Sequence, residues 1–142
     1  MIAGLIIKRK VKESYAEALS QHDLPNVMSS YHDDATLIYP GEVPASGTFK
    51  GKAAIEGWLR QYFDQFPGIY IDIKDVYVKS IFGLRTNTVV IHWDMQLTNR
   101  DGLTGKNSGV SVVEIKEGKL FCSKDFPFDQ GEDNFKRLWG AV

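Results

Sequence analysis

Apolar residues recur at helical spacing in the first part of the chain. The positions that carry this pattern are spaced i, i+4, i+7 and i+8: Val11, Tyr15, Ala18 and Leu19. This spacing predicts one amphipathic helix over about residues 5–21, with Tyr15 facing inward. Asp23, ahead of Leu24-Pro25, is placed to cap a short second helix that reaches about Tyr31.

A strand and a third helix are predicted next. Residues 35–39 read as a strand ended by Pro40-Gly41, and residues 44–47 read as a loop. Residues 53–66 predict a helix that ends at Pro67-Gly68. Its apolar face is broad and aromatic, formed by Ile55, Trp58, Leu59, Tyr62 and Phe66.

From residue 69 the period changes from that of helices to that of strands. Turn signals separate four long strands, over about 69–80, 88–98, 104–115 and 119–128, and residues 133–139 suggest a small final helix. Because the connections are hairpin-short, the sheet should be mostly antiparallel. Helices followed by such a meander predict an α+β fold, in which the N-terminal helices pack on the sheet.

Length and charge narrow the class of protein. The 142 residues are expected to form a single domain over 1–142, large enough to bury its own core. A formal charge of −1 gives no electrostatic reason to expect nucleic acid or an anionic membrane as a partner. A single cysteine is typical of a protein from a reducing compartment. The apolar start precedes Lys8-Arg9-Lys10, which is the reverse of the order in a signal peptide, and no apolar stretch is long enough to cross a membrane. We therefore expect a cytoplasmic protein without a signal peptide.

The stretch His92-Trp93-Asp94 carries the clearest candidate chemistry. On a strand over 89–97, His92 and Asp94 share one side and the apolar residues share the other. A carboxylate beside an imidazole can orient it or exchange a proton with it near neutral pH. The same pattern is also typical of a half-buried strand whose polar side faces solvent, so both interpretations stay open.

A metal site is the other hypothesis for this pair. A histidine and a carboxylate two residues apart begin the facial triad of non-haem iron enzymes, which needs a later histidine. None follows His92, because the other two histidines are His22 and His32. We therefore expect no metal and no cofactor.

Several segments resemble one fold family in their order and spacing. They are Ser14-Tyr15-Ala16-Glu17-Ala18-Leu19 with His22-Asp23-Leu24, then Tyr31-His32-Asp33-Asp34-Ala35-Thr36, Gly51-Lys52-Ala53-Ala54-Ile55 and Glu117-Gly118-Lys119-Leu120. Together they resemble the NTF2-like (SnoaL-like) superfamily, which includes nuclear transport factor 2, ketosteroid isomerase, limonene-epoxide hydrolase and the SnoaL-type polyketide cyclases. The resemblance implies a curved sheet that forms a cone around a deep apolar pocket.

The resemblance also suggests catalytic residues. Tyr15 matches the isomerase tyrosine that stabilises an oxyanion, whereas Tyr39 and Ser111 stand where the isomerase has acids. The hydrolase site places His92, Asp94 and Asp125 together, with His92 in the position of an arginine. In SnoaL-type cyclases an acid near Asp125 accepts a proton.

These matches predict a small-molecule enzyme that performs cofactor-independent acid-base chemistry of isomerase, cyclase or hydrolase type. Its substrate would be a small apolar, oxygenated organic molecule. The catalytic residues would be Asp125, His92, Asp94 and Tyr15, and the ligand-binding residues Tyr39, Trp58, Tyr62 and Phe63. The alternative is a non-catalytic ligand-binding or dimerising module. A homodimer is expected from apolar residues on the open sheet face, namely Val110, Val112, Ile115 and Trp93.

Overall fold

The computed structural model describes residues 2–80, 82, 85–129 and 136–140. Its elements in chain order are α1 (Ile2–Arg9), the π-helical segment η1 (Lys10–Ala16), α2 (Glu17–Ser20), α3 (Leu24–Ser29), β1 (Tyr31–Tyr39), β2 (Gly47–Lys50), α4 (Lys52–Gln65), β3 (Gly68–Val78), β4 (Thr86–Thr98), β5 (Thr104–Lys116) and β6 (Lys119–Pro127). The helix expected over 133–139 starts in residues outside the described part of the chain.

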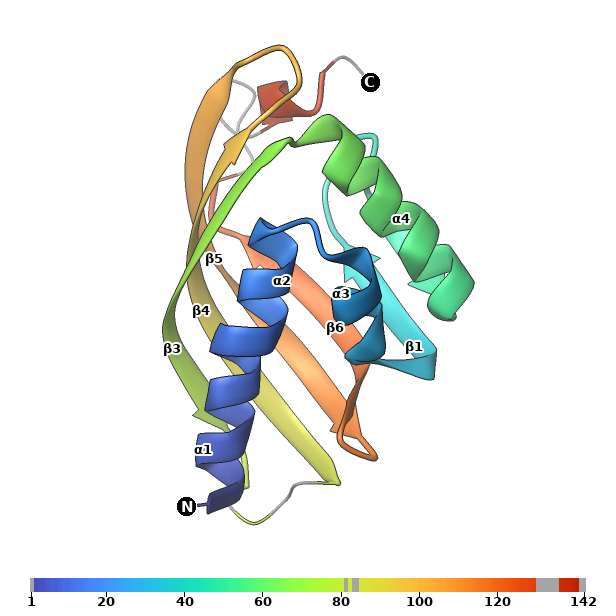
Figure 1. Cartoon of the computed structure of the whole chain (residues 1–142), viewed down its shortest axis with the longest axis vertical. Helices are drawn as coiled ribbons and strands as arrows, with labels where there is room; N and C mark the ends of the chain where they lie inside the picture. Colours follow the sequence, from blue (N-terminus) through green and yellow to red (C-terminus); the bar gives the residue numbers. More distant parts are fainter. Residues whose placement is uncertain (1, 81, 83–84, 130–135, 141–142) are drawn as a thin grey trace.

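One curved sheet of six strands runs through the molecule in the order β2-β1-β6-β5-β4-β3. All neighbouring strands are antiparallel except β1 and β6, which are parallel. The helices lie across one face of this sheet (Figure 1). The α+β prediction, with N-terminal helices on a mostly antiparallel curved sheet, is confirmed.

Most of the predicted elements lie within a few residues of those in the structure. The Asp23 carboxylate accepts a hydrogen bond from the Asn26 amide at 3.2 Å, which confirms the expected cap of α3. The first strand begins at Tyr31, four residues earlier than predicted. β2 was missed, because its four residues follow a loop and gain their strand conformation by pairing with β1.

The first helix is not a regular α-helix. Its central segment, η1, is π-helical, a conformation that often occurs at functional sites. Ile7, Val11 and Tyr15, spaced four residues apart, all turn towards the concave face of the sheet from α1 and η1. Periodicity predicted the inward face correctly but not the change of helix type, because both types keep residues four apart on one side.

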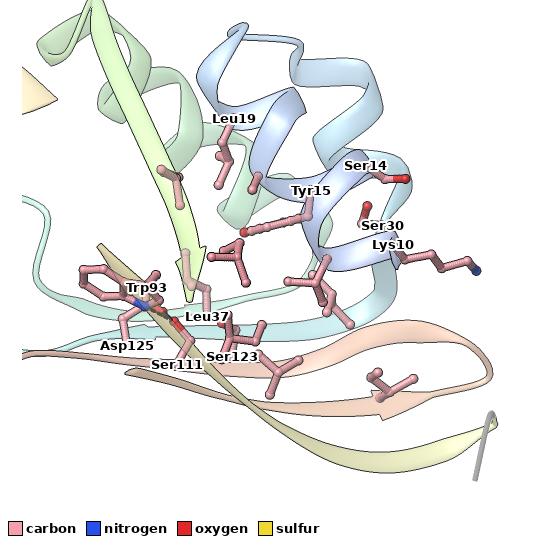
Figure 2. A pocket seen from close by; sticks show the side chains of 18 of the residues that line it. Lys10, Ser14, Tyr15, Leu19, Ser30, Leu37, Trp93, Ser111, Ser123 and Asp125 are labelled. Carbon is pink, nitrogen blue, oxygen red and sulfur yellow. Dashed lines mark hydrogen bonds between the residues drawn. The ribbon is translucent and has the colours of Figure 1, made fainter. Parts of the chain in front are cut away.

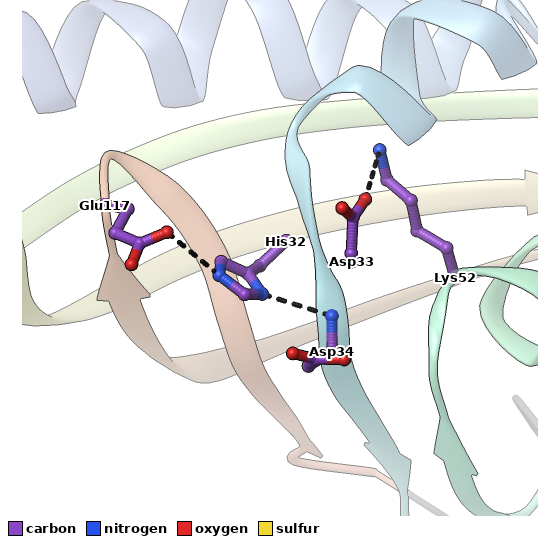
Figure 3. Close-up of polar contacts among 5 residues, drawn as sticks. All are labelled: His32, Asp33, Asp34, Lys52 and Glu117. Atoms are coloured by element: carbon purple, nitrogen blue, oxygen red, sulfur yellow. Dashed lines mark hydrogen bonds and ion pairs between the residues drawn. The ribbon is translucent and has the colours of Figure 1, made fainter.

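A register shift in β1 and another in β6 change the face of the sheet to which the following side chains point. β1 bulges between Tyr31 and Thr36, where His32 Nδ1 accepts a hydrogen bond from the Asp34 amide at 3.1 Å (Figure 3). β6 carries an extra residue opposite Glu114 and Ile115. Consequently Leu120, rather than Phe121, lies on the same face as Ser123 and Asp125.

Gly109 on β5 allows the Trp93 side chain to pack flat against the sheet. The two residues are directly opposite each other in the pairing of β4 with β5. A methyl group at Gly109 would lie 2.6 Å from Trp93 Cη2 and 2.6 Å from the Phe126 carbonyl oxygen. Because one of these neighbours is backbone, the clash cannot be relieved by a side-chain rotation alone.

The substitution Gly109→Ala should therefore lower the free energy of unfolding by about 2 kcal/mol, the usual cost of overpacking. Urea unfolding measures the change. Gly57→Ala is the matched control, because Gly57 lies in α4 with open space around it. That variant should gain about 1 kcal/mol. Equal stability of Gly109→Ala and the parent would contradict the close approach.

Candidate functional site

A cavity of about 360 Å³ lies between the helices and the concave face of the sheet (Figure 2). Its walls are mainly apolar side chains from η1 and from strands β3, β4, β5 and β6. They include Val11, Ile71, Ile73, Ile91, Trp93, Met95, Val113, Ile115 and Leu120. A mostly apolar cavity with a few polar groups is the usual form of a small-molecule site.

Asp125 on β6 is the acidic residue of this lining. Its Oδ1 accepts a hydrogen bond of 2.6 Å from the Ser111 hydroxyl, and the Ser111 oxygen accepts one of 3.0 Å from the Trp93 indole. Because the indole nitrogen can only donate and a serine has one hydroxyl proton, the direction of this chain is set. The other carboxyl oxygen, Oδ2, takes no part in this chain of hydrogen bonds. Figure 2 shows the side chains of Trp93, Ser111 and Asp125 grouped together.

The surroundings of Asp125 favour its neutral form. Burial raises the pKa of Asp125 from 3.8 to about 6, although the hydrogen bond from Ser111 lowers it in part. Removing a carboxylate from water disfavours the charged form unless enough donors replace the water. A carboxyl with this pKa can exchange a proton with a ligand near neutral pH.

Two paired tyrosine hydroxyls lie near enough to Asp125 for its charge to affect their pKa. The hydroxyl oxygens of Tyr15 and Tyr31 are 2.6 Å apart and share a hydrogen bond. Burial raises the pKa of both, and the charge of Asp125 raises it further. Both tyrosines therefore stay protonated. Only one proton is needed between the two oxygens, so the pair keeps a second O–H to donate.

Two further tyrosines and a tryptophan form the deep end of the cavity. The Tyr62 hydroxyl donates to Met95 Sδ at 3.5 Å, a weak acceptor. The Tyr39 ring packs against Trp58 and Trp139, with centroids 5.5 and 6.0 Å away. The buried Trp139 indole nitrogen has no well-formed hydrogen bond within the described residues. The Tyr39 and Tyr62 hydroxyls can be used by an oxygenated ligand, whereas Trp139 is not part of the cavity lining.

The expected meeting of His92, Asp94 and Asp125 does not occur. His92 and Asp94 do share one side of β4, but the cavity is lined from this strand by Ile91, Trp93 and Met95. The polar pair thus lies on the outer face of the sheet. This is the solvent-side alternative, and it arises because the concave interior takes the apolar side of the strand.

The partners of Asp94 are also on the outer face. Ser108 donates to its Oδ1 at 2.6 Å, and Lys74 Nζ is 3.6 Å from Oδ2. The hydrogen bond from Ser108 and the charge of Lys74 hold the pKa of Asp94 below its usual value. His92 packs near the exposed Phe128 ring, with centroids 6.1 Å apart. The arrangement of two carboxylates around a cationic bridge, suggested by the hydrolases, is therefore absent from the cavity.

Of the four predicted ligand-binding residues, three line the cavity: Tyr39, Trp58 and Tyr62. Phe63 does not, because it points towards His22 and packs on its ring at 4.8 Å. Sequence reasoning missed the polar roles of Ser111, Trp93 and Tyr31. Ser111 and Asp125 are directly paired across β5 and β6, so a correct strand register could have joined them.

Among the described residues, no group of three or more His, Cys, Asp or Glu side chains is arranged to hold a metal ion. Within the same part of the chain, no helix has the length and apolar character needed to span a membrane.

The SnoaL-like domain model matches residues 11–122. The match covers most of the chain, which therefore belongs to the SnoaL-like domain family, as the sequence resemblance predicted. No curated protein matches the sequence.

Solved structures share the fold at low sequence identity. Bal32a from a soil-derived mobile gene cassette has a TM-score of 0.79 at 20% identity, over 96% of this chain and 98% of its own. An NTF2-like protein of unknown function from Burkholderia pseudomallei K96243 has a TM-score of 0.76 at 23% identity, over 94% and 97%. A putative scytalone dehydratase from Novosphingobium aromaticivorans DSM 12444 has a TM-score of 0.74 at 12% identity, over 90% and 88%.

Replacing Ser111 tests the source of the Asp125 pKa. In Ser111→Ala the carboxylate loses the hydrogen bond that stabilises its charged form, so the pKa of Asp125 should rise further above about 6. Carbon-13 NMR titration of the aspartate carboxyls measures it. Ser123→Ala is the matched control, because Ser123 lines the same cavity without contributing to this shift. A pKa that is unchanged, or that falls, in Ser111→Ala would contradict the assigned hydrogen bond.

Proposed function

We propose that the protein is a cofactor-independent enzyme that moves a proton on a small apolar, oxygenated molecule held in the cavity. The observation that carries this proposal is the placement of Asp125. One carboxyl with a pKa raised to about 6 lies in an apolar chamber beside tyrosine hydroxyls. Perturbed titratable groups in such cavities are characteristic of acid-base catalysts.

The geometry supports proton abstraction beside a carbonyl group. Asp125 Oδ2 takes the proton from the carbon atom, and the bonding electron pair moves to the carbonyl oxygen to form an enolate. The O–H left free in the pair of Tyr15 and Tyr31 donates to that oxygen and stabilises its charge. Asp125 then returns the proton to the same or another carbon. Alternatively the enolate carbon attacks a second carbonyl carbon of the substrate, the π electron pair of that carbonyl moves to its oxygen, and the resulting alkoxide takes the proton from Asp125.

This mechanism favours an isomerase or cyclase over a hydrolase. An epoxide hydrolase of the type considered needs one ionised and one protonated carboxyl near the same water. Asp125 is in the cavity, whereas Asp94 is on the opposite face of the sheet. Proteins of similar fold include a putative scytalone dehydratase and TerC, which was crystallised with polyporic acid. A small organic ligand in a protein of similar fold is consistent with a small organic substrate here.

Exchange of carbon-bound hydrogen in D₂O tests the mechanism directly. The probe is 2-tetralone, an apolar bicyclic ketone with acidic α-hydrogens, and mass spectrometry follows deuterium incorporation. We expect the exchange rate to rise with pH through about 6, because the base is the ionised form of Asp125. Asp125→Asn should lower the rate roughly a hundredfold or more, the usual contribution of a placed base.

The stability of Asp125→Asn is the control that separates a lost catalytic step from a lost fold. The folded-state pKa of Asp125 lies above its unfolded value, so its ionisation destabilises the fold as pH rises through about 6. Asp125→Asn should thus gain stability over the parent above pH 6, by up to about 3 kcal/mol, and gain nothing at pH 3. Equal exchange by parent and variant would overturn the proposal and leave the non-catalytic ligand-binding module.

We also propose that two copies of the chain associate through the outer face of the sheet. Val110 and Val112 point outward as expected, whereas Trp93 and Ile115 line the cavity and take no part. Exposed aromatic side chains extend the outer surface over neighbouring strands: Tyr70, Tyr77, Phe126 and Phe128. A contiguous apolar surface on a sheet favours a symmetric contact with a second copy.

Sedimentation velocity tests this association. The parent should sediment as a dimer, and Phe126→Glu/Phe128→Glu should be monomeric, because two charges would be buried without partners. Phe82→Glu is the control: Phe82 is 85% exposed and lies in the connection between β3 and β4. A monomeric parent, or dissociation by the control alone, would rule out the proposed surface.

A further inference from the structure

The exposed residues of the cavity lining are gathered at one end. Lys10 and Ser14 come from η1 and Asn26 and Ser29 from α3. Gly118 comes from the turn between β5 and β6, and Lys119 is the first residue of β6. The backbone of this turn is tied to the end of α3, because the Leu120 amide donates to the Ser30 carbonyl at 2.8 Å. These six exposed residues define the mouth of the cavity.

Asp125 lies far from this mouth. It follows Lys119 by six residues on β6, a separation of about 20 Å along an extended strand. Figure 2 shows Lys10, Ser14 and Ser30 at one end of the cavity and Trp93, Ser111 and Asp125 at the other, with Tyr15 between them. The cavity is therefore long, with a polar mouth, apolar walls and a carboxyl at depth.

The positive and negative side chains of the lining also lie at different depths in the cavity. Its charged residues are the two lysines at the mouth and Asp125 inside. Within the described part of the chain, neither Lys10 nor Lys119 forms an ion pair.

The acids nearest to the two lysines in sequence are held elsewhere. Glu13 pairs with Arg9 at 2.8 Å and Glu117 with His32 at 3.2 Å (Figure 3). The two mouth ammonium groups are thus available to a ligand.

We propose that the substrate is an elongated apolar molecule with an anionic group, a carboxylate or phosphate, at the end remote from the reacting carbon. Lys10 and Lys119 hold this anion at the mouth, which directs the other end towards Asp125. Burying the anion in the apolar chamber would cost much more than leaving it in water beside two lysines. The orientation of the reacting end rests on the proposed function, whereas binding of the anion at the mouth does not.

Three ten-carbon probes test this inference on the full chain: decanoate, decyl phosphate and 1-decanol. Binding is followed by the fluorescence of the tryptophans, since Trp58 and Trp93 line the cavity. At low salt the tighter anion should bind about tenfold more strongly than the alcohol, from two exposed charge contacts. The better of the two anions identifies the group.

Charge-neutral variants separate a local effect from one of net charge. In Lys10→Gln/Lys119→Gln the preference for the anion over 1-decanol should fall to within about twofold. Lys12→Gln/Lys50→Gln removes the same charge from exposed positions outside the lining and should keep the tenfold preference. Equal binding of anions and alcohol by the parent, an unchanged preference in the first variant, equal loss in the control, or no binding would each overturn the inference.

Two crossed measurements keep this inference distinct from the proposed function. Asp125→Asn should retain the anion preference, because Asp125 is remote from the mouth. Exchange of 2-tetralone by the parent reports on Asp125 without involving the lysines, because this ketone carries no anionic group. Failure of ketone exchange with an intact anion preference would reject the acid-base role alone, and the reverse result would reject the lysine site alone.

Discussion

The candidate chemistry of this protein depends on the burial of one carboxyl group. The helices packed over the concave sheet shield Asp125 from bulk water, although it remains partly exposed within the cavity, and it receives a hydrogen bond from Ser111. Burial and this bond act in opposite directions on its pKa, and burial is the larger effect. An apolar cavity without the carboxyl could bind a ligand but could not exchange a proton with it. A carboxyl exposed to solvent would stay ionised at neutral pH and would be a weak base. The combination places proton transfer in the neutral range.

The rest of the fold can be understood as support for this group. Gly109 lets Trp93 pack on β5, and Trp93 in turn donates to Ser111. The bulge in β6 gives Asp125 and Leu120 a common inward face. The aromatic groups of α4 and the C-terminal Trp139 close the deep end, and the cationic mouth remains open to solvent. The acidic group and the two lysines of the lining are thus separated along one cavity.

The sequence was informative about elements and less so about faces. Helical and alternating periods located the helices and the four long strands within a few residues, because local spacing decides which side of each element is apolar. The π-helical segment, β2 and the bulges were not predicted, since each depends on pairing or packing with a distant part of the chain. Tyr15 and Asp125 were placed in the site by family resemblance, and both line the cavity.

His92 and Asp94 show why the remaining assignments needed the tertiary structure. Alternation established that the two share one side of β4, but it cannot tell which side of a sheet faces a cavity and which faces outward. That choice is made by the curvature of the sheet and by the helices that cover its concave face. The sequence alone determined most of the elements and the family and suggested Asp125 as a candidate, whereas only tertiary packing decided which polar groups meet this carboxyl, because these contacts join residues from different strands.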